Sequence, residues 1–288
     1  MIKLGLIAHL DRPRVGEAAG QIVDWGEHHG IKIRMCDDLA ALAKRDDLAC
    51  PNDRIGEECD IIISLGGDGS MLSSARAVAD HQLPILGINL GSLGFLTEID
   101  SDRIIESLEN LRAGKYRIEE RMVLETSFDP DVKNKRLAFN DVVVDHGEST
   151  NLVRIDLFAN DEFVSSYNAD GIIIATPTGS TAYSLSVGGP IINPLMEAIA
   201  VSPVSSHTLT LRPIIFPADI VLSVRGGQSG EVLRVSMDGR IVGSLGDRQK
   251  IKIRRAPLKL KLIRFGARSF YSVLRKKLHW GKRPLMNG

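Results

Sequence analysis

A glycine-rich turn, Gly66-Gly67-Asp68-Gly69-Ser70, has the residue types of a phosphate-binding loop. It follows the apolar run Ile61–Leu65 and precedes a segment with helical periodicity. Glycines let backbone N–H groups approach phosphate oxygens, and a helix N-terminus favours negative charge. A carboxylate here is repelled by phosphate unless it takes a proton from an attacking hydroxyl or helps to hold a metal. The turn predicts phosphoryl transfer, with an Asp-Gly turn and a capping serine as an equally weighted alternative.

A hydroxyl-rich stretch lies further along the chain, at residues 168–184. After Asn168-Ala169-Asp170-Gly171 and an apolar run, residues 176–184 contain five Ser/Thr hydroxyls, a glycine and a tyrosine. Such groups bind ribose and phosphate, and the tyrosine ring can contact a base. A capped helix start is the alternative, but a cap needs one or two of these hydroxyls rather than five. We therefore favour a nucleotide-binding turn.

Two shorter polar motifs interrupt apolar segments. Asn140-Asp141 precedes Val142–Val144, where buried polar groups need partners, and by itself the pair indicates a bulge or an edge position. Residues 237–240, Met-Asp-Gly-Arg, are typical of a hairpin turn. The seven histidines have no metal-ligand spacing and the three cysteines form no Cys-x-x-Cys pair, so we expect no metal site made by the protein alone.

The elements that must position these motifs change character near residue 115. Before it, strand-like and helix-like segments alternate, which indicates a parallel sheet with right-handed crossovers. After it, short alternating segments with turn residues, and one helix near 181–187, indicate antiparallel strands. We predict an α/β plus all-β fold: an α/β domain with a parallel sheet at 1–115, an antiparallel β-rich, sandwich-like domain at 116–268, and a tail at 269–288 that can pack back on the first domain.

Composition limits the class of function. Of 288 residues, 43% are apolar, which excludes a disordered chain. Only 5% are aromatic, and the 36 Lys+Arg equal the 36 Asp+Glu, so neither base stacking nor net charge gives a reason for a nucleic-acid partner. The neutrality is a cancellation, because residues 250–288 hold 13 Lys/Arg and no acidic residue. The cysteine pattern, with no signal peptide and no apolar run of membrane length, predicts a cytoplasmic protein with no membrane partner.

Taken in order, four segments resemble the ATP-NAD kinase family: Gly66–Gly69, Gly91–Thr97, Asn140-Asp141 and Asp170–Pro190. The glycine turn also occurs in lipid and sugar kinases, whereas the long last segment is similar to NAD kinases. The resemblance spans roughly residues 3–280 and implies phosphorylation of the adenosine-ribose 2′-hydroxyl of NAD by ATP, giving NADP and ADP. It also implies a divalent metal ion, Mg²⁺, that arrives with ATP, and a cytoplasmic homo-oligomer, a dimer or tetramer, in NADP biosynthesis.

The family pattern assigns a role to each matching position. Asp68 would be the general base or orienting group for the 2′-hydroxyl, with Gly69 beside it. Asn140 would hold the adenine, Asp141 a ribose hydroxyl, and Asp170 the nicotinamide carboxamide, partly across a subunit boundary. The ATP phosphates would meet Gly66, Gly67, Gly69 and Ser70. The other NAD-binding residues would be Asn151, Asn168, Thr178, Thr181, Ala182, Tyr183, Ser184, Leu185, Ser186 and Arg240.

Several of these positions depart from the family pattern. Asp141 stands where the family usually has Glu, and Asn151 where it often has His or another larger residue. Asn168 stands where relatives have Arg, and Arg240 where they have Gln. Losing a cation at 168 and gaining one at 240 would alter how the pyrophosphate is held or how NADH is discriminated.

Two other functions stay open on the residues alone. A lipid or sugar kinase can use the same glycine turn, although no large apolar patch with aromatics is evident for a lipid. A nucleotide-sensing or nucleic-acid-binding module would use the basic residues 250–288. However, Lys250–Leu262 alternates basic and apolar residues as a half-buried strand with a solvated face does. We therefore rank the kinase acting on NAD first.

Overall fold

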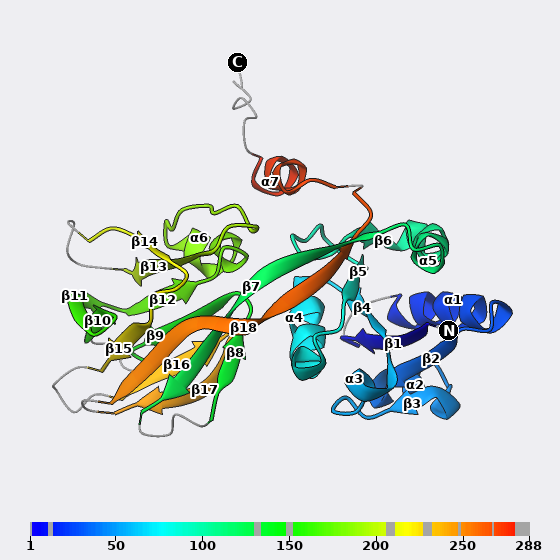
Figure 1. The fold of residues 1–288 in the computed structure, drawn as a ribbon, viewed down its shortest axis with the longest axis horizontal. Coiled ribbons are helices and arrows are strands. Elements are labelled where there is room, and N and C mark those ends of the chain that lie inside the picture. Colours follow the sequence, from blue (N-terminus) through cyan, green and yellow to red (C-terminus); the bar gives the residue numbers. More distant parts are fainter. Residues whose placement is uncertain are drawn as a thin grey trace, which may run out of the picture. The chain divides into compact units, whose positions relative to one another are not determined.

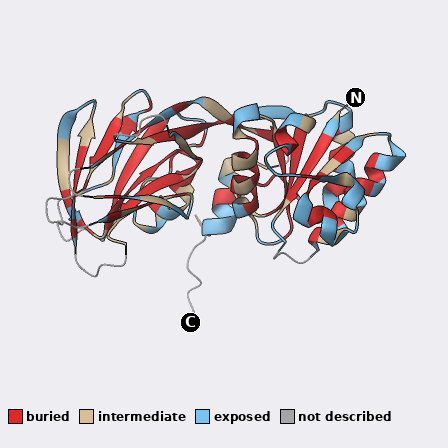
Figure 2. Ribbon diagram, turned by 90° about the horizontal axis from the view of Figure 1, so that it is seen from below, coloured by how far each residue is buried: buried red, intermediate tan, exposed pale blue. Residues whose placement is uncertain are grey.

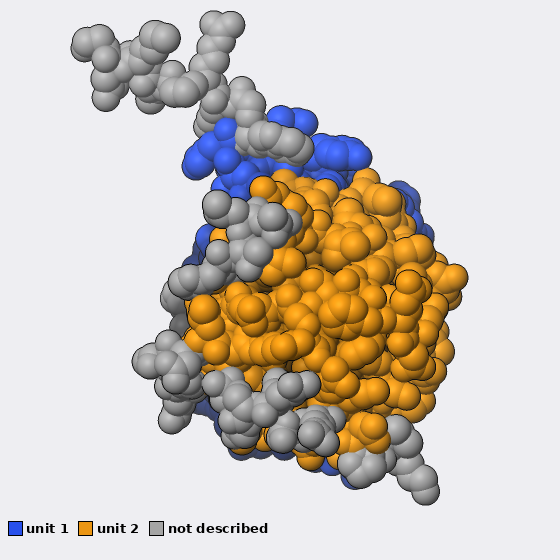
Figure 3. Space-filling model, turned by 90° about the vertical axis from the view of Figure 1, so that its left-hand side faces the viewer, with its two compact units in different colours: residues 1–120, 260–288 blue, residues 121–259 orange. Residues whose placement is uncertain are grey.

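The computed structural model describes residues 2–10, 14–129, 134–147, 152–205, 211–226, 232–246, 249–266 and 268–279. The chain forms two compact units, coloured separately in Figure 3. Residues 1–120 and 260–288 make the first unit, and residues 121–259 make the second. These bounds differ from the predicted domains, because residues 116–120 and 260–268, which we grouped with the β-rich domain, belong to the first unit.

The first unit is built on a parallel sheet in the order β3-β2-β1-β4-β5. The chain runs outward from β1 through β2 to β3, and then returns to the other side of β1 for β4 and β5 (Figure 1). Beside β5, Leu262 of β18 and the short β6 also pair in parallel. The elements are β1 (Lys3–Ala8), α1 (Val15–His28), β2 (Lys32–Cys36), α2 (Asp37–Leu42), β3 (Ala49–Cys50), α3 (Ile55–Glu58), β4 (Ile61–Gly66), α4 (Asp68–Ala77), β5 (Ile85–Asn89), β6 (Ile99–Asp100), α5 (Ile104–Arg112) and α7 (Phe270–Leu278).

The apolar runs explain why these strands occupy the centre of the unit. Every residue of β4 and β5 is buried, as expected for parallel strands that helices cover on both faces. Figure 2 shows the strands in the buried colour and the outer faces of the helices exposed. Helix α1 turns Ala19, Ile22 and Val23 into the core. The predicted parallel α/β architecture is thereby confirmed.

The second unit contains two antiparallel layers. One has the order β14-β13-β12-β9-β16-β17, and the other runs from β11 through β10 and β15 to the first part of β18. β7 pairs with β18 and with β8. The elements are β7 (Arg117–Phe128), β8 (Arg136–Ala138), β9 (Asp141–Asp145), β10 (Val153–Ala159), β11 (Glu162–Ala169), β12 (Gly171–Ala175), α6 (Tyr183–Ser186), β13 (Ala198–Val204), β14 (Ile214–Pro217), β15 (Leu222–Arg225), β16 (Leu233–Met237), β17 (Arg240–Leu245) and β18 (Lys250–Arg264).

One apolar cluster joins these layers. Ile155 and Ile253 come from one layer, and Val142, Ile172 and Val235 from the other. Alternating apolar residues of facing sheets are what a β-sandwich core requires. The predicted antiparallel β-rich unit is confirmed. Within the described residues, no helix has the length and apolar character to cross a membrane.

Candidate active site

The glycine turn lies where two neighbouring parallel strands end. β4 and β5 run in register with Gly66 opposite Asn89, and the Leu90 N–H donates to the Gly66 carbonyl at 3.1 Å. The strand order reverses between β1 and β4, beside this point. Ligands of such sheets bind outside the carboxyl ends of the strands near the reversal. The fold therefore directs Gly66–Ser70 and residues 89–96 to the place where a ligand is expected.

Asp68 is the first residue of α4, and the loop after β5 fixes its carboxylate. The Phe95 N–H donates to Oδ2 and the Leu96 N–H to Oδ1, both at 2.9 Å. Gly94 makes this approach possible, because a Cβ at that position would lie 2.7 Å from Asp68 Cγ and still closer to Oδ1. The carboxylate is thus oriented by backbone groups while its side chain keeps 29% exposure.

A second set of contacts holds that loop. The Asn89 side chain donates to the Gly91 carbonyl at 3.0 Å and accepts from its N–H at 3.2 Å. Arg264 Nη1 donates to the Leu96 carbonyl at 3.0 Å and to Glu98 at 3.1 Å. Arg264 and Glu98 are almost fully buried, and a buried charge pair needs the further hydrogen bonds that it has here. Hydrogen bonds therefore hold the loop that orients Asp68 on both sides, at Gly91 and at Leu96.

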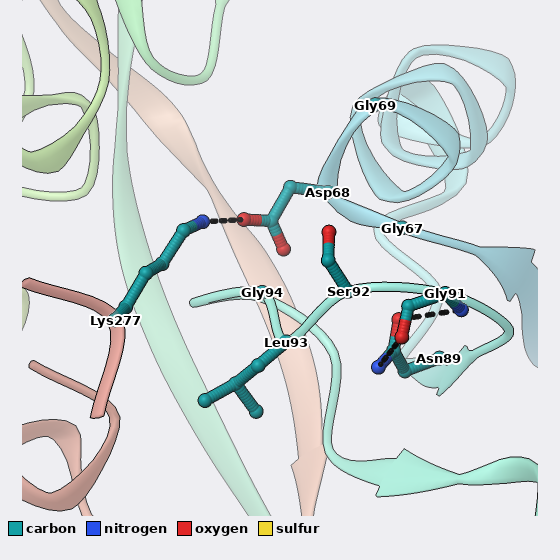
Figure 4. Close-up of a pocket in the computed structure, with 9 residues that line it drawn as sticks. All are labelled: Gly67, Asp68, Gly69, Asn89, Gly91, Ser92, Leu93, Gly94 and Lys277. Atoms are coloured by element: carbon teal, nitrogen blue, oxygen red, sulfur yellow. Dashed lines mark hydrogen bonds and ion pairs between the residues drawn. The ribbon is translucent and has the colours of Figure 1, made fainter.

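These residues enclose a pocket of about 220 Å³ in the first unit (Figure 4). Cβ atoms built on Gly67 and Gly69 would meet nothing within 4 Å, so their backbone is open to a ligand. Lys277 of α7 also reaches the pocket, with Nζ 3.7 Å from Asp68 Oδ2. The lining residues are Gly67, Asp68, Gly69, Asn89, Gly91, Ser92, Leu93, Gly94 and Lys277. The predicted residues Gly66 and Ser70 belong to the turn but are not among the residues that line the pocket. Ser70 is buried, and Gly66 has a φ of +143°, a conformation that favours glycine.

In the second unit, Asn140 and Asp141 stand at the start of β9. The Asp238 carboxylate accepts N–H bonds from Phe139 at 3.1 Å, Asn140 at 2.7 Å and Asp141 at 3.3 Å. Asp238 and Gly239 both have positive φ, and Met237 pairs with Arg240, as in a type I′ hairpin. The predicted hairpin turn is therefore present, and its aspartate shapes the backbone of the polar pair. Burial, and then the charge of Asp238, raise the pKa of Asp141 to about 7.

The hydroxyl-rich turn packs directly against Asn140. The Thr176 N–H donates to the Asn140 carbonyl at 2.8 Å, and its hydroxyl donates to the Phe139 carbonyl at 2.8 Å. Gly179 lies so close that a Cβ there would be 2.7 Å from Asn140 Cα and nearer still to the carbonyl. Asn140, Asp141 and the turn are thus one cluster, and Arg240 at the adjoining hairpin is exposed.

Most hydroxyls of this turn have partners inside the protein. Ser180 donates to the Pro177 carbonyl at 2.6 Å, Thr181 donates to the Thr178 carbonyl at 3.1 Å, and Ser184 bonds Ser202 at 3.2 Å. Thr178 Oγ1 lies 3.4 Å from Arg121 Nη1. The hydroxyls therefore build the turn, although neither the 3₁₀ turn at Gly179–Thr181 nor α6 has a hydrogen bond from a capping side chain. The predicted helix 181–187 is also shorter, since α6 covers Tyr183–Ser186 after a 3₁₀ turn at Gly179–Thr181.

The structure does not bring Asn168 and Asp170 to this cluster within one chain. β12 pairs with β9 so that Ala175 faces Asp141 and Gly171 faces Asp145. Asp170 directly precedes the opposite end of β12 and lies about 17 Å from Ala175 by the strand rise. Ala182 and Leu185 are half-buried, and Tyr183 and Ser186 are exposed. Asn151 lies outside the described residues.

Sequence reasoning missed four residues that shape these clusters: Asn89, Gly94, Asp238 and Lys277. Asn89 was the last residue of a strand predicted at Pro84–Asn89, and Gly94 stood in the glycine-punctuated stretch after it, which was a usable signal. In the sequence, Asp238 is indistinguishable from an ordinary turn residue, and Lys277 is one of 13 Lys/Arg in residues 250–288. Their contacts join segments far apart in sequence, which local patterns do not reveal.

A carboxylate among exposed backbone groups, outside the ends of parallel strands, fits a phosphotransferase with an alcohol acceptor, in which a carboxylate orients the attacking hydroxyl or takes its proton. Two solved structures share the fold. A yeast NADH kinase complexed with NADH has a TM-score of 0.89 at 24% identity, covering 100% of this chain and 90% of that chain. An NAD kinase from Archaeoglobus fulgidus in complex with ATP has a TM-score of 0.74 at 20% identity, covering 96% and 99%.

The chain belongs to the ATP-NAD kinase family. Residues 4–116 match the ATP-NAD kinase N-terminal domain, and residues 139–265 match the C-terminal domain. The NAD kinase of Moorella thermoacetica is 38% identical, covering 98% of this chain and 90% of that protein. The NAD kinase of Heliobacterium modesticaldum is also 38% identical, covering 98% and 100%.

Proposed function

We propose that this chain transfers the γ-phosphate of ATP to the 2′-hydroxyl of the adenosine ribose of NAD, giving NADP and ADP. Family membership and similarity to NAD kinases over nearly the whole chain support the activity. The observation that carries the chemistry is the Asp68 carboxylate, which two backbone N–H groups orient in a pocket with open glycine backbone.

In the proposed reaction, the 2′-hydroxyl oxygen attacks the γ-phosphorus and its proton passes to the Asp68 carboxylate. The bond to the β,γ-bridging oxygen breaks, and its electron pair leaves with ADP. A secondary alcohol is a weak nucleophile, so most of the rate must come from in-line positioning and neutralised phosphate charge. The backbone at Gly67 and Gly69, with the turn from Gly66 to Ser70, would hold the phosphates near the start of α4.

NAD recognition is assigned to the second unit. Asn140 would bind the adenine and Asp141 a ribose hydroxyl, and their shared contacts with Asp238 support a common role. The turn that packs on Asn140 would line the adenosine pocket through Thr178 and Thr181–Ser186, with Arg240 beside it. Asn151, Asn168 and Asp170 would serve the nicotinamide side.

A divalent cation, Mg²⁺, is proposed to arrive with ATP. Among the residues that the structure describes, no three His, Cys, Asp or Glu side chains gather into a metal site. The pocket does offer hard oxygen groups at Asp68 and Ser92, which fit an ion that phosphates and water hold for the most part. When bound, such an ion would neutralise charge on the phosphates.

A homo-oligomer, dimer or tetramer, is proposed because Asp170 lies away from Asn140 within one chain. In a symmetric assembly, a second copy can supply it to the nicotinamide end. A cytoplasmic location is proposed from the family and from Cys36, Cys50 and Cys59, which are free and buried. The product assigns the protein to NADP biosynthesis.

Replacing Asp68 by Asn tests the proposed chemistry. We expect Asp68→Asn to bind NAD and to lose at least roughly 100-fold in kcat, the range for a general base. The matched control is Asp80→Asn, at an exposed position of the same unit, which should leave kcat unchanged. NADP formation from NAD and ATP is the measurement, and near-normal turnover in folded Asp68→Asn would exclude the assigned role.

The acceptor is tested in the same assay. We expect phosphorylation of NAD and none of diacylglycerol or fructose 6-phosphate, which the other kinases with a similar turn use. Polyphosphate in place of ATP identifies the donor. Phosphorylation of a lipid or sugar without NADP formation would overturn the proposed function.

A further inference from the structure

Lys277 is a cation placed inside the phosphate pocket. Its Nζ lies 3.7 Å from Asp68 Oδ2 and 4.8 Å from the centroid of the Phe95 ring. Figure 4 shows the side chain extending from α7 toward Asp68. Neither the glycine turn nor the family motifs assign this residue a role, although it lines the same pocket as Gly67 and Gly69.

Contacts along helix α7 hold it in a position from which Lys277 extends into the pocket. Ser269 and Ser272 form a capping box at its start, and Val273 and Leu274 are buried. The Phe270 ring lies 6.1 Å from the Phe95 ring, and Phe95 itself donates its N–H to Asp68. The helix is therefore packed on the very loop that orients the carboxylate.

The contact with Asp68 stabilises the fold too little to explain why a lysine stands at position 277. At 3.7 Å, Nζ is beyond the usual length of a charge-assisted hydrogen bond. The side chains of Lys277 and Asp68 are 40% and 29% exposed, and ion pairs so open to water add little stability. The Phe95 ring face holds the ammonium beside the pocket, since cations favour such faces.

We propose that Lys277 binds the γ-phosphate of ATP. On nucleotide binding, the ammonium would leave Asp68 for a γ-phosphate oxygen, where the greater negative charge lies. This movement neutralises the transferred group and frees the carboxylate to face the 2′-hydroxyl. The inference rests on the proposed kinase function and gives one of the basic residues after position 250 a specific task.

The test compares ATP and ADP binding, because ADP lacks the proposed target of Lys277. Binding is measured by calorimetry without NAD, so that no turnover occurs. We expect Lys277→Gln to weaken ATP binding roughly 10-fold, the loss of one hydrogen bond to a charged group, and ADP binding by less than about twofold. Lys277→Arg should recover part of the ATP affinity, because it keeps the charge.

Lys276→Gln is the matched control. It removes the same charge from the next residue of α7, whose exposed side chain is not among those lining the pocket. We expect ATP binding within about twofold of wild type, as for a surface substitution. In steady-state assays, Lys277→Gln should lower kcat/KM for ATP at least roughly 10-fold and leave the KM for NAD unchanged.

Three results would overturn the inference: unchanged ATP binding by Lys277→Gln, an equal loss for ATP and ADP, or the same loss in Lys276→Gln. Equal loss would indicate a structural role, and loss in the control would indicate general attraction of anions. A wild-type protein that forms no NADP would overturn the proposed function instead. The ATP and ADP comparison would still decide the role of Lys277.

Discussion

The Asp141 carboxylate is buried. The residue is 4% exposed, and its backbone N–H donates to Asp238, a second carboxylate. Burial, with the charge of Asp238 as the smaller cause, raises the pKa of Asp141 to about 7. Its side chain is held at the strand start beside Asn140, where under the proposed function a ribose hydroxyl of NAD would give it a polar partner.

This raised pKa makes stability depend on pH. Asp141 holds its proton more tightly in the folded chain than in the unfolded chain, where the pKa is near 3.8. Its contribution to the free energy of unfolding is thus full below about pH 4 and is lost as pH rises to about 7. We predict that wild type, relative to Asp141→Asn, loses roughly 1 to 3 kcal/mol between pH 5 and 8.

Urea denaturation of both proteins at the two pH values measures the difference. Asp161→Asn, in the exposed turn after β10, is the control and should follow wild type at both. A gap between wild type and Asp141→Asn that does not change with pH would show that Asp141 is already ionised at pH 5.

At the scale of elements, the site depends on the loop after β5. The loop presents the N–H groups of Phe95 and Leu96 to Asp68, and Gly94 leaves room for the carboxylate. Arg264, from the end of β18, holds the same loop through the Leu96 carbonyl. The glycine turn alone therefore does not define the chemistry, because a second loop aims its carboxylate.

Gly94→Ala tests this loop. The added methyl group would overlap the Asp68 carboxylate, so either the carboxylate or the loop must move. We predict a loss of at least roughly 10-fold in kcat, since small displacements of a reacting group are costly. Gly20→Ala is the control, because its Cβ meets nothing within 4 Å in α1, and it should stabilise the protein by about 0.5–1 kcal/mol.

Initial rates of NADP formation and thermal unfolding are measured for both variants. Normal kcat in Gly94→Ala would mean that the orientation of Asp68 by Phe95 and Leu96 is not needed for the reaction.

The sequence predicted the elements around the glycine turn well, because continuous apolar runs and helical periodicity are local signals. β4, α4 and β5 were expected close to where they lie. The hydroxyl-rich turn was predicted as an element, but the number of its hydroxyls does not tell which of them are available to a ligand. Ser180 and Ser184 are bonded within the protein. Side-chain composition does not distinguish a group that binds a ligand from one that holds a turn.

At the scale of the whole molecule, both units were predicted in class but not in extent. Lys250–Arg264 alternates as one strand, so the whole strand looked like part of the β-rich domain. Its first residues pair with β15, whereas Leu262 pairs with Ile85 of the parallel sheet. The alternation of apolar and polar residues is the same in both halves of this strand, so it does not show where the strand passes from one hydrophobic core to the other.

The proposed oligomer gives a prediction at this scale. If one copy supplies Asp68 and another Asp170, mixed assemblies of Asp68→Asn and Asp170→Ala chains contain some sites with both aspartates intact. Random pairing of equal amounts restores about a quarter of wild-type activity, because half of the pairs are mixed and half of their sites are complete. Each variant alone should have little activity.

Co-expression of the two variant chains in equal amounts provides the randomly paired assemblies, and NADP formation is the readout. Unmixed variants combined after purification serve as the control for simple addition of residual activities. No recovery in mixed assemblies would mean that Asp170 acts with Asp68 of its own chain or is not needed.

The discontinuity of the first unit has a consequence for the order in which the protein is made. Residues 121–259 form one uninterrupted unit, whereas the first unit needs both 1–120 and residues from 260 onward. On the ribosome, the β-rich unit can therefore be complete while the parallel sheet still awaits Leu262, and the pocket around Asp68 still awaits Lys277. A nascent chain therefore carries the turn around Asp68 for most of translation before it has a finished pocket.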